Sequence, residues 1–133
     1  MLDPFILRRL TPIVLAAAGL GTAGLVAVHV AGADAAARTH KLKLSAKPKA
    51  IKFNKTKLTT KAGKVTITFT NPKGSVAPHA VAVEGHGIDK DGKIIPAGKS
   101  AKLTVTLKKG TYDFYCPVDG HEAAGMKGKL VVK

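Results

Sequence analysis

The chain has 133 residues but contains only one cysteine, no tryptophan, two tyrosines and four phenylalanines. A lone cysteine cannot form an internal disulfide, so no disulfide framework holds this fold. It also cannot supply the several thiolates of a Cys-rich zinc finger or of a four-Cys iron–sulfur cluster. The length leaves room for one ordinary domain with a tail, which excludes two domains of typical size.

Acidic residues are scarce as well, since 8 Asp+Glu stand against 22 Lys+Arg and give a formal net charge of +14. The charges of residues 1–35 cancel, so the whole excess lies on residues 36–133, where Arg38 is the only arginine. Proteins that read nucleic acids favour arginine forks and aromatic stacking platforms. Because both are nearly missing here, we expect a lysine-rich solvated surface and no nucleic-acid partner.

An uncharged stretch at residues 10–33 follows the pair Arg8-Arg9 and is rich in Ala, Gly, Val and Leu. A short basic head, an apolar middle and small residues behind it are typical of an export signal. The positive head stays inside, so the remainder of the chain is expected at the periplasmic or extracellular face of the cytoplasmic membrane.

Two A-x-A sequences, at residues 33–35 and 35–37, fit a signal-peptidase site and favour removal of the segment. The apolar stretch is also long enough to span a bilayer, so a retained anchor stays open. We therefore divide the chain into residues 1–37, a signal peptide or membrane anchor, and residues 38–133, an exported domain.

Apolar and polar residues alternate with a period of two through most of this domain, as on strands with one buried face. The alternating segments are residues 42–44, 51–53, 65–69, 81–83, 103–107 and 129–133, and turn signals lie at 61–63, 71–74, 89–92, 96–98 and 109–110. No long helical pattern follows residue 35. We predict an all-β domain, an antiparallel Greek-key β-sandwich, preceded by an N-terminal hydrophobic export or anchor helix.

The segment 110–133 carries the chemistry, because Cys116, His121 and Met126 follow one another with four residues between each pair. Thiolate, imidazole and thioether form a soft ligand set that selects copper, and two His with one Cys and a weak axial Met give blue-copper geometry. The second imidazole must come from elsewhere. His79, just after a turn and at the start of a strand, is the candidate.

The spacing also suits a rigid site. Tyr112, Phe114 and Cys116 share one face by the period of two, so the thiol is expected to point inward with the core. Gly120 and Gly125 permit the tight backbone of a loop that returns to the last strand. A preorganised site of this kind limits reorganisation between Cu(I) and Cu(II) and so favours fast electron transfer.

The sequences GTYDFYC at residues 110–116 and AGMKGKLVV at residues 124–132 resemble the cupredoxins, the small blue copper proteins of the plastocyanin and azurin type. The resemblance extends from about residue 40 to residue 133, and the Cys-to-His spacing is similar to that of auracyanin- and rusticyanin-like members. It implies a cupredoxin-like fold that holds one copper ion per chain, Cu(I) or Cu(II). The ligands that it implies are His79, Cys116, His121 and Met126.

The resemblance also implies a structural role for Tyr112 at a corner of the sandwich. In many cupredoxins an Asn follows the first His ligand and ties the two ligand loops together, whereas Ala80 stands there in this sequence. A small apolar collar around the second His is the docking and electron-exit face of the family. Here that collar would consist of Pro117, Val118, Ala123, Ala124 and Gly125.

The prediction is thus a monomeric type 1 copper protein that carries single electrons and is not an enzyme. Its lysines favour a redox partner with an acidic docking patch, and an anionic membrane or cell-wall surface is a second candidate contact. The alternative is a copper module for storage, delivery or sensing. We expect His86 to be a solvated loop residue. His40, in a linker, and His29, in the export segment, are not expected to be ligands.

Overall fold

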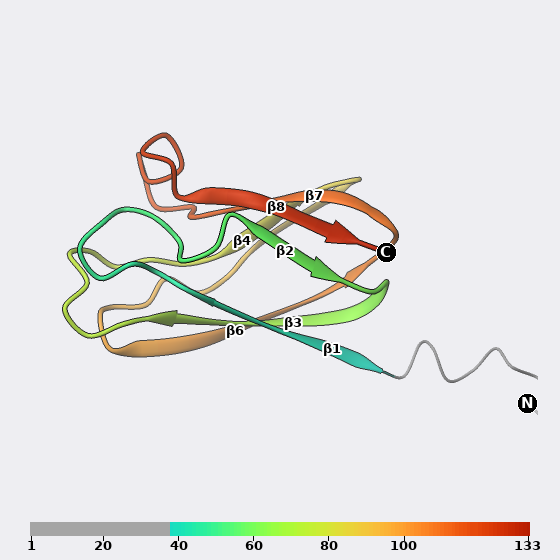
Figure 1. Ribbon diagram of the computed structural model, residues 1–133, viewed down its shortest axis with the longest axis horizontal. Coiled ribbons are helices and arrows are strands. Elements are labelled where there is room, and N and C mark those ends of the chain that lie inside the picture. The colour runs from blue at the N-terminus through green and yellow to red at the C-terminus, as the bar shows by residue number, and fades with distance from the viewer. Residues whose placement is uncertain (1–37) are drawn as a thin grey trace, which may run out of the picture.

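The computed structural model describes residues 38–133, and these residues form eight β-strands (Figure 1). The predictions for residues 1–37, including the N-terminal helix, lie outside the described residues. Within residues 38–133 no helix is long and apolar enough to cross a membrane. The strands are β1 (Thr39–Ser45), β2 (Lys57–Thr60), β3 (Gly63–Asn71), β4 (Ala82–Gly85), β5 (Ile88–Asp91), β6 (Lys99–Leu107), β7 (Gly110–Tyr115) and β8 (Lys127–Val132).

The strands build two sheets that pack face to face. One sheet has three strands in the order β1-β3-β6, and the other has five in the order β2-β8-β7-β4-β5. Figure 1 shows them as two layers, with the start of β1 and the end of β8 at one end and the β7–β8 loop at the other. The predicted all-β sandwich is therefore confirmed.

The prediction of a purely antiparallel sandwich was wrong, because β1 pairs with β3 in parallel and β2 pairs with β8 in parallel. Alternation shows which face of a strand is buried, but it carries no information about the direction of the neighbouring strand. Parallel neighbours need a long connection rather than a hairpin. Here the chain runs from β1 through β2, in the opposite sheet, before it returns as β3.

Two local predictions also fail. Residues 51–53 form no strand, since Phe53 makes only an isolated bridge to Ala46. The segment 89–92, interpreted as a turn, lies largely in β5, which pairs with β4. Its Asp-Lys-Asp-Gly composition is typical of a turn, but β5 is an exposed edge strand in which polar side chains face solvent.

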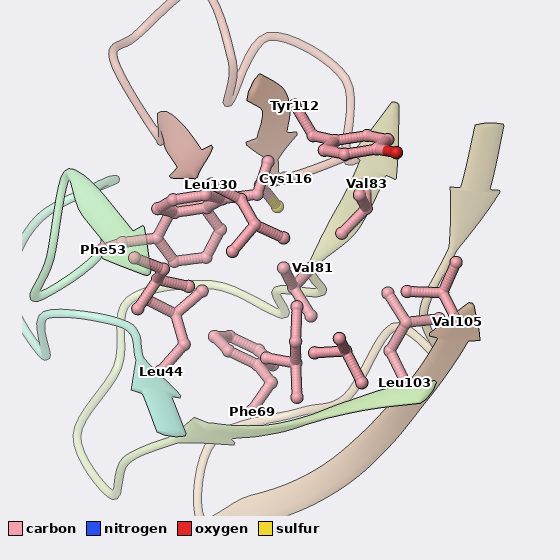
Figure 2. Close-up of a cluster of buried hydrophobic side chains, with 14 of the residues drawn as sticks. Leu44, Phe53, Phe69, Val81, Val83, Leu103, Val105, Tyr112, Cys116 and Leu130 are labelled. Atoms are coloured by element: carbon pink, nitrogen blue, oxygen red, sulfur yellow. The ribbon is translucent and has the colours of Figure 1, made fainter. Parts of the chain in front are cut away.

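The core lies between the sheets and is filled by the inward residues of the alternating strands. Phe53 packs edge-on against Phe69 at 5.8 Å between ring centroids and lies 5.5 Å from Phe114. Figure 2 shows Phe53, Phe69 and the Cys116 sulfur within one continuous cluster. Buried side chains of this cluster include Leu44, Val65, Ile67, Val81, Val83, Leu103, Val105, Leu107, Tyr112, Leu130 and Val132.

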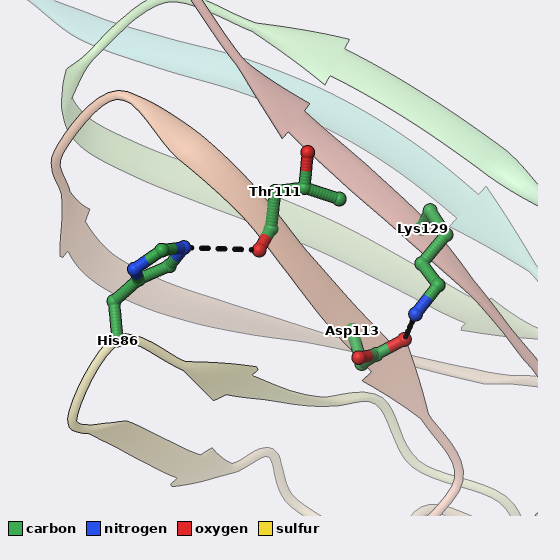
Figure 3. Close-up of polar contacts among 4 residues, drawn as sticks. All are labelled: His86, Thr111, Asp113 and Lys129. Atoms are coloured by element: carbon green, nitrogen blue, oxygen red, sulfur yellow. Dashed lines mark hydrogen bonds and ion pairs between the residues drawn. The ribbon is translucent and has the colours of Figure 1, made fainter.

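Tyr112 has the corner role that the family resemblance implied. Its hydroxyl donates to the Lys108 carbonyl at 3.0 Å and accepts from the Lys108 amide at 3.2 Å, which ties β7 to the preceding turn. His86 lies at the same end of the sandwich, with its ring 4.9 Å from that of Tyr112 and its Nε2 3.2 Å from the Thr111 carbonyl (Figure 3). It is exposed, as expected, but it packs on its neighbours.

Gly128 in β8 gives a test of the packing, because a Cβ at this position would fall on the Phe114 ring and on the Thr56 carbonyl oxygen. We predict that Gly128→Ala lowers the free energy of unfolding by about 2 kcal/mol or more, through overpacking. Urea unfolding of the metal-free protein measures the change. Thr59→Ala, at an exposed position of β2, is the control and should change stability by less than about 0.5 kcal/mol. Equal stability of the two variants would contradict the proposed close contact.

Candidate metal centre

Cys116 stands immediately after β7, and its side chain points into the core (Figure 2). The inward positions of β7 are Tyr112 and Phe114, both buried, and the period of two carries the same direction to Cys116. The thiol is 1% exposed. The strand thus places the sulfur at a fixed position between the two sheets, as the sequence predicted.

His79 comes from the loop between β3 and β4, far from Cys116 in sequence. Its amide donates to the Ile95 carbonyl at 3.1 Å, and its own carbonyl accepts from the Ile95 amide at 2.9 Å. This isolated two-bond bridge holds the loop backbone on the segment before β6. The imidazole is fully buried, so its orientation is set by the core around it.

The loop from β7 to β8 contributes His121 and Met126. The Cys116 amide donates to the Met126 carbonyl, and the Met126 amide donates to the His121 carbonyl, both at 3.0 Å. Gly120 and Gly125 have φ of 77° and 99°, a left-handed conformation that favours glycine. The tight loop brings His121 back beside Cys116 and returns Met126, with its side chain fully buried, to the core.

The donor atoms converge. The Nδ1 atoms of His79 and His121 are 3.1 Å apart, and the Cys116 Sγ lies 3.5 Å from His121 Nδ1 and 4.0 Å from His79 Nδ1. A first-row metal ion with bonds of about 2.0 Å to nitrogen and 2.3 Å to sulfur in a trigonal plane would separate its donors by about 3.5 to 3.7 Å. The three observed separations bracket that range, so the donor set fits a metal ion.

Burial favours the neutral, metal-binding form of His79. Burial, and to a lesser degree the nearby His121, lowers the pKa of His79 below its ordinary value. The Nε2 atom of His79 is buried and has no hydrogen-bond partner among residues 38–133, so a positive charge on the ring would be poorly solvated. Nδ1, the nitrogen that faces Cys116 and His121, is therefore available to bind a metal near neutral pH.

Asn71 is a residue of the site that the sequence reasoning missed. It is fully buried at the end of β3, and its Nδ2 donates to the carbonyls of Ala77 and Ile95, each at 3.0 Å. The backbone carbonyl of Asn71 accepts a hydrogen bond from the Gly98 amide at 2.7 Å. Asn71 thus ties the loop that carries His79 to the segment on which His79 pairs.

Asn71 also bears on the departure noted at Ala80. Ala80 is fully buried and has no side chain that could link the two ligand loops. Asn71 instead links the loop that carries His79 to the segment before β6. The sequence signal for Asn71 was hidden, because Asn-Pro-Lys-Gly is also a typical turn. A polar residue at a position whose alternation demands an apolar one was the available sign.

The other histidines of the described chain do not join the site. Of the His and Cys residues in residues 38–133, the cluster of donors contains only His79, Cys116 and His121. His86 lies on the β4–β5 turn against Tyr112. His40 was placed in a linker, but it belongs to β1.

Carboxylates gather beside the site on the outer side of the five-stranded sheet. Burial raises the pKa of Tyr115, the residue before Cys116, and so do Asp89, Asp91, Glu84 and Glu122. Across the sheet Glu84 stands directly opposite both Asp89 and Asp113. The surface near Tyr115 is therefore acidic, in contrast to the net charge of the chain.

Comparison with known families agrees with this geometry. The family described as copper binding proteins, plastocyanin/azurin family, matches residues 40–133. The chain belongs to that family. None of the curated proteins compared by sequence matches it.

Solved structures of the same fold include auracyanin B, with 24% identity, a TM-score of 0.64, and coverage of 71% of this chain and 88% of auracyanin B. Reduced rusticyanin has 25% identity, a TM-score of 0.58, and coverage of 71% and 79%. The copper nitrite reductase of Nitrosomonas europaea has 23% identity and a TM-score of 0.60; 72% of this chain covers only 42% of the reductase. The expected likeness to auracyanin and rusticyanin is thus confirmed at the level of fold.

Asn71 yields a prediction for the site. Asn71→Ala removes both donors, so the Ala77 carbonyl loses this partner and the Ile95 carbonyl keeps only the His79 amide, at a cost of about 1–3 kcal/mol in the free energy of unfolding. The loop bearing His79 should loosen, and copper affinity should fall by about 10-fold or more. Chelator competition measures the affinity.

Ser75→Ala is the matched control in the same loop, because the Ser75 hydroxyl is buried and has no hydrogen-bond partner among the described residues. This variant should keep both stability and copper affinity. If Asn71→Ala bound copper as tightly as the Ser75 variant, the positioning role of Asn71 would be refuted.

Proposed function

We propose that this protein is a type 1 copper protein that carries single electrons between redox partners outside the cytoplasmic membrane. The observation that carries the proposal is the convergence of two imidazole Nδ1 atoms on one thiol sulfur, with all three separations at or below 4.0 Å. Membership of the plastocyanin/azurin family supports copper as the metal. Copper held there would supply a Cu(I)/Cu(II) couple that stores one electron.

His79, Cys116 and His121 would be the main ligands of the copper, and Met126 would be a weaker fourth ligand. The Met126 side chain is fully buried, and its backbone bonds to both Cys116 and His121. Three of these four side chains are therefore fixed in the core. A site held this firmly changes little on gain or loss of an electron, which suits a carrier.

His121 is the ligand that gives access to the outside. It is half-buried, while the other three are buried. Among its neighbours in the loop, Ala123 and Ala124 are exposed, and Pro117 and Val118 are half-buried. We assign this small apolar surface as the contact for a redox partner, with the electron passing through the edge of the His121 ring.

The alternative of a storage, delivery or sensing module calls for an open site from which a ligand can be exchanged. The exposures of His79, Cys116 and Met126 are 0%, 1% and 0%, which supports the carrier. An enzyme such as copper nitrite reductase shares the fold, but this chain spans less than half of that protein.

Export is proposed from the sequence of residues 1–37, with the domain at the periplasmic or extracellular side. The excess of lysine over acidic residues would raise the encounter rate with a partner that bears an acidic patch. The apolar surface around His121 would then make the final contact.

The copper assignment predicts an intense blue absorption band when the protein is loaded with Cu(II), because Cys116 would bind the ion as a thiolate. Cys116→Ser should abolish the band. His86→Gln is the matched control, since His86 lies at the far end of β7 against Tyr112, and it should leave the band intact. A colourless wild-type product would rule out a type 1 site, and irreversible voltammetry of a blue protein would favour storage over transfer.

The role of Met126 yields a second prediction. Met126→Leu should keep the blue band and raise the reduction potential, because the weak thioether donor that favours Cu(II) is removed. Voltammetry measures the shift. Leu130→Met, the reverse exchange at a buried position of β8, should leave the potential close to that of the wild type. Complete loss of copper from the Met126 variant would show that the thioether is a strong ligand instead.

A further inference from the structure

The outer face of the three-stranded sheet, here called the basic face, consists of the outward residues of β1, β3 and β6. Inward positions of these strands hold the core, so the alternate positions face solvent. Every one of them is lysine, threonine or serine. They are Thr39, Lys41, Lys43, Ser45, Lys64, Thr66, Thr68, Thr70, Ser100, Lys102, Thr104 and Thr106.

The register sets these side chains in rows across the sheet. Lys43, Thr68 and Lys102 form one row, which places the two lysines on either side of a threonine at a strand spacing of about 4.8 Å. Hydroxyls on the neighbouring rows pair with each other, as in the 2.8 Å contact between Thr66 and Thr104. The basic face is therefore a polar array of cations and hydroxyls without an apolar patch.

Acidic side chains are confined to other parts of the described chain. The carboxylates of residues 38–133 lie on β4, β5 and β7 or in the β7–β8 loop: Glu84, Asp89, Asp91, Asp113, Asp119 and Glu122. None lies on β1, β3 or β6. The lysines of the basic face consequently have no internal counter-charge on their own sheet.

The cationic surface continues around the edge of β1. A hollow of about 700 Å³ opens beside the start of this strand, and the side chains that line it include Arg38, Lys41, Lys61 and Lys133. No acidic side chain of residues 38–133 lines it. This end of the sandwich is opposite the β7–β8 loop, which carries His121 (Figure 1).

We propose that the basic face and the adjoining hollow bind the phosphate headgroups of an anionic lipid surface. Lysine ammonium groups and serine and threonine hydroxyls both donate hydrogen bonds to phosphate oxygens. An array on one side of a sheet suits an extended surface of repeated phosphates better than a single anion. The proposal concerns a surface remote from the metal donors, so it stands apart from the proposed electron transfer.

The length of chain before Arg38 favours lipid over a soluble polyanion. Only residues 34–37 separate the apolar stretch 10–33 from Arg38, and five residue steps span at most about 18 Å in any conformation. If the stretch is retained in a bilayer, Arg38 lies within about 18 Å of the edge of the hydrocarbon core, so the hollow stays close to the headgroups. The charge argument for the basic face holds whether or not the stretch is removed.

Lysine footprinting of the full chain on vesicles tests the proposal. An amine-acylating reagent is applied to the protein on phosphatidylcholine vesicles and on vesicles with added phosphatidylglycerol, and labelling rates are read by mass spectrometry. Lys41, Lys43, Lys64 and Lys102 should react about fivefold more slowly on the anionic vesicles, and about 0.5 M salt should restore their rates. The exposed lysines Lys49, Lys57, Lys93 and Lys127, which lie off the basic face, should change by less than about twofold.

Matched variants separate the face from the net charge. One variant replaces the four lysines of the basic face by Gln, and the other replaces the four control lysines; Lys61 in the hollow reports protection in both. The additional Lys61 protection on anionic vesicles, relative to phosphatidylcholine vesicles, should vanish in the first variant and persist in the second, with the Cu(II) absorption unchanged in each. Equal loss in both variants, or uniform protection of all lysines, would show that net charge alone acts. Protection by soluble polyphosphate but not by vesicles would overturn the lipid assignment.

Discussion

The hydrogen bond between the Cys116 amide and the Met126 carbonyl joins the two ends of the β7–β8 loop, and the metal centre depends on it. The bond continues the pairing of β7 with β8 by one step beyond the last paired residues, Tyr115 and Lys127. The next bond, from the Met126 amide to the His121 carbonyl, fixes the chain within the loop. Because these bonds are made by the backbone, the positions of three donor residues follow from the sheet itself.

The fourth donor residue reaches the site from a different part of the chain and needs its own support. His79 is held by two backbone hydrogen bonds to Ile95. The buried side-chain amide of Asn71 donates to the carbonyl of Ala77, in the His79 loop, and to the carbonyl of Ile95. The two supports are independent in sequence, but both rest on the same core. Displacing one donor relative to the others would therefore require moving packed side chains, and that requirement keeps the donor separations fixed.

Much of this could be predicted from sequence, because two kinds of information are local. Alternation located β1, β3, β4, β6, β7 and β8, and the spacing of Cys116, His121 and Met126 indicated the loop. Strand direction could not be predicted in this way, since the parallel pairing of β1 with β3 depends on a connection through the other sheet. Asn71 was missed for a similar reason: its partners lie 6 and 24 residues away, so its role exists only in the folded chain.

The distribution of charge could not be predicted from the net value either. A row of carboxylates, Asp89, Glu84 and Asp113, crosses the five-stranded sheet, with Lys129 paired to Asp113 at its end. These carboxylates form an acidic surface within a strongly basic domain, although like charges directly opposite each other cost stability.

Net charge and local charge act over different distances. Beyond a Debye length of about 8 Å a partner experiences mainly the overall positive field, which governs the rate of encounter. At contact the partner meets the local surface. Near His121 this surface is apolar, with Asp119 and Glu122 close by, whereas on the β1-β3-β6 sheet it is cationic. Two faces of opposite character can thus serve two different contacts, and a partner at His121 is selected by the loop rather than by the sum of the charges.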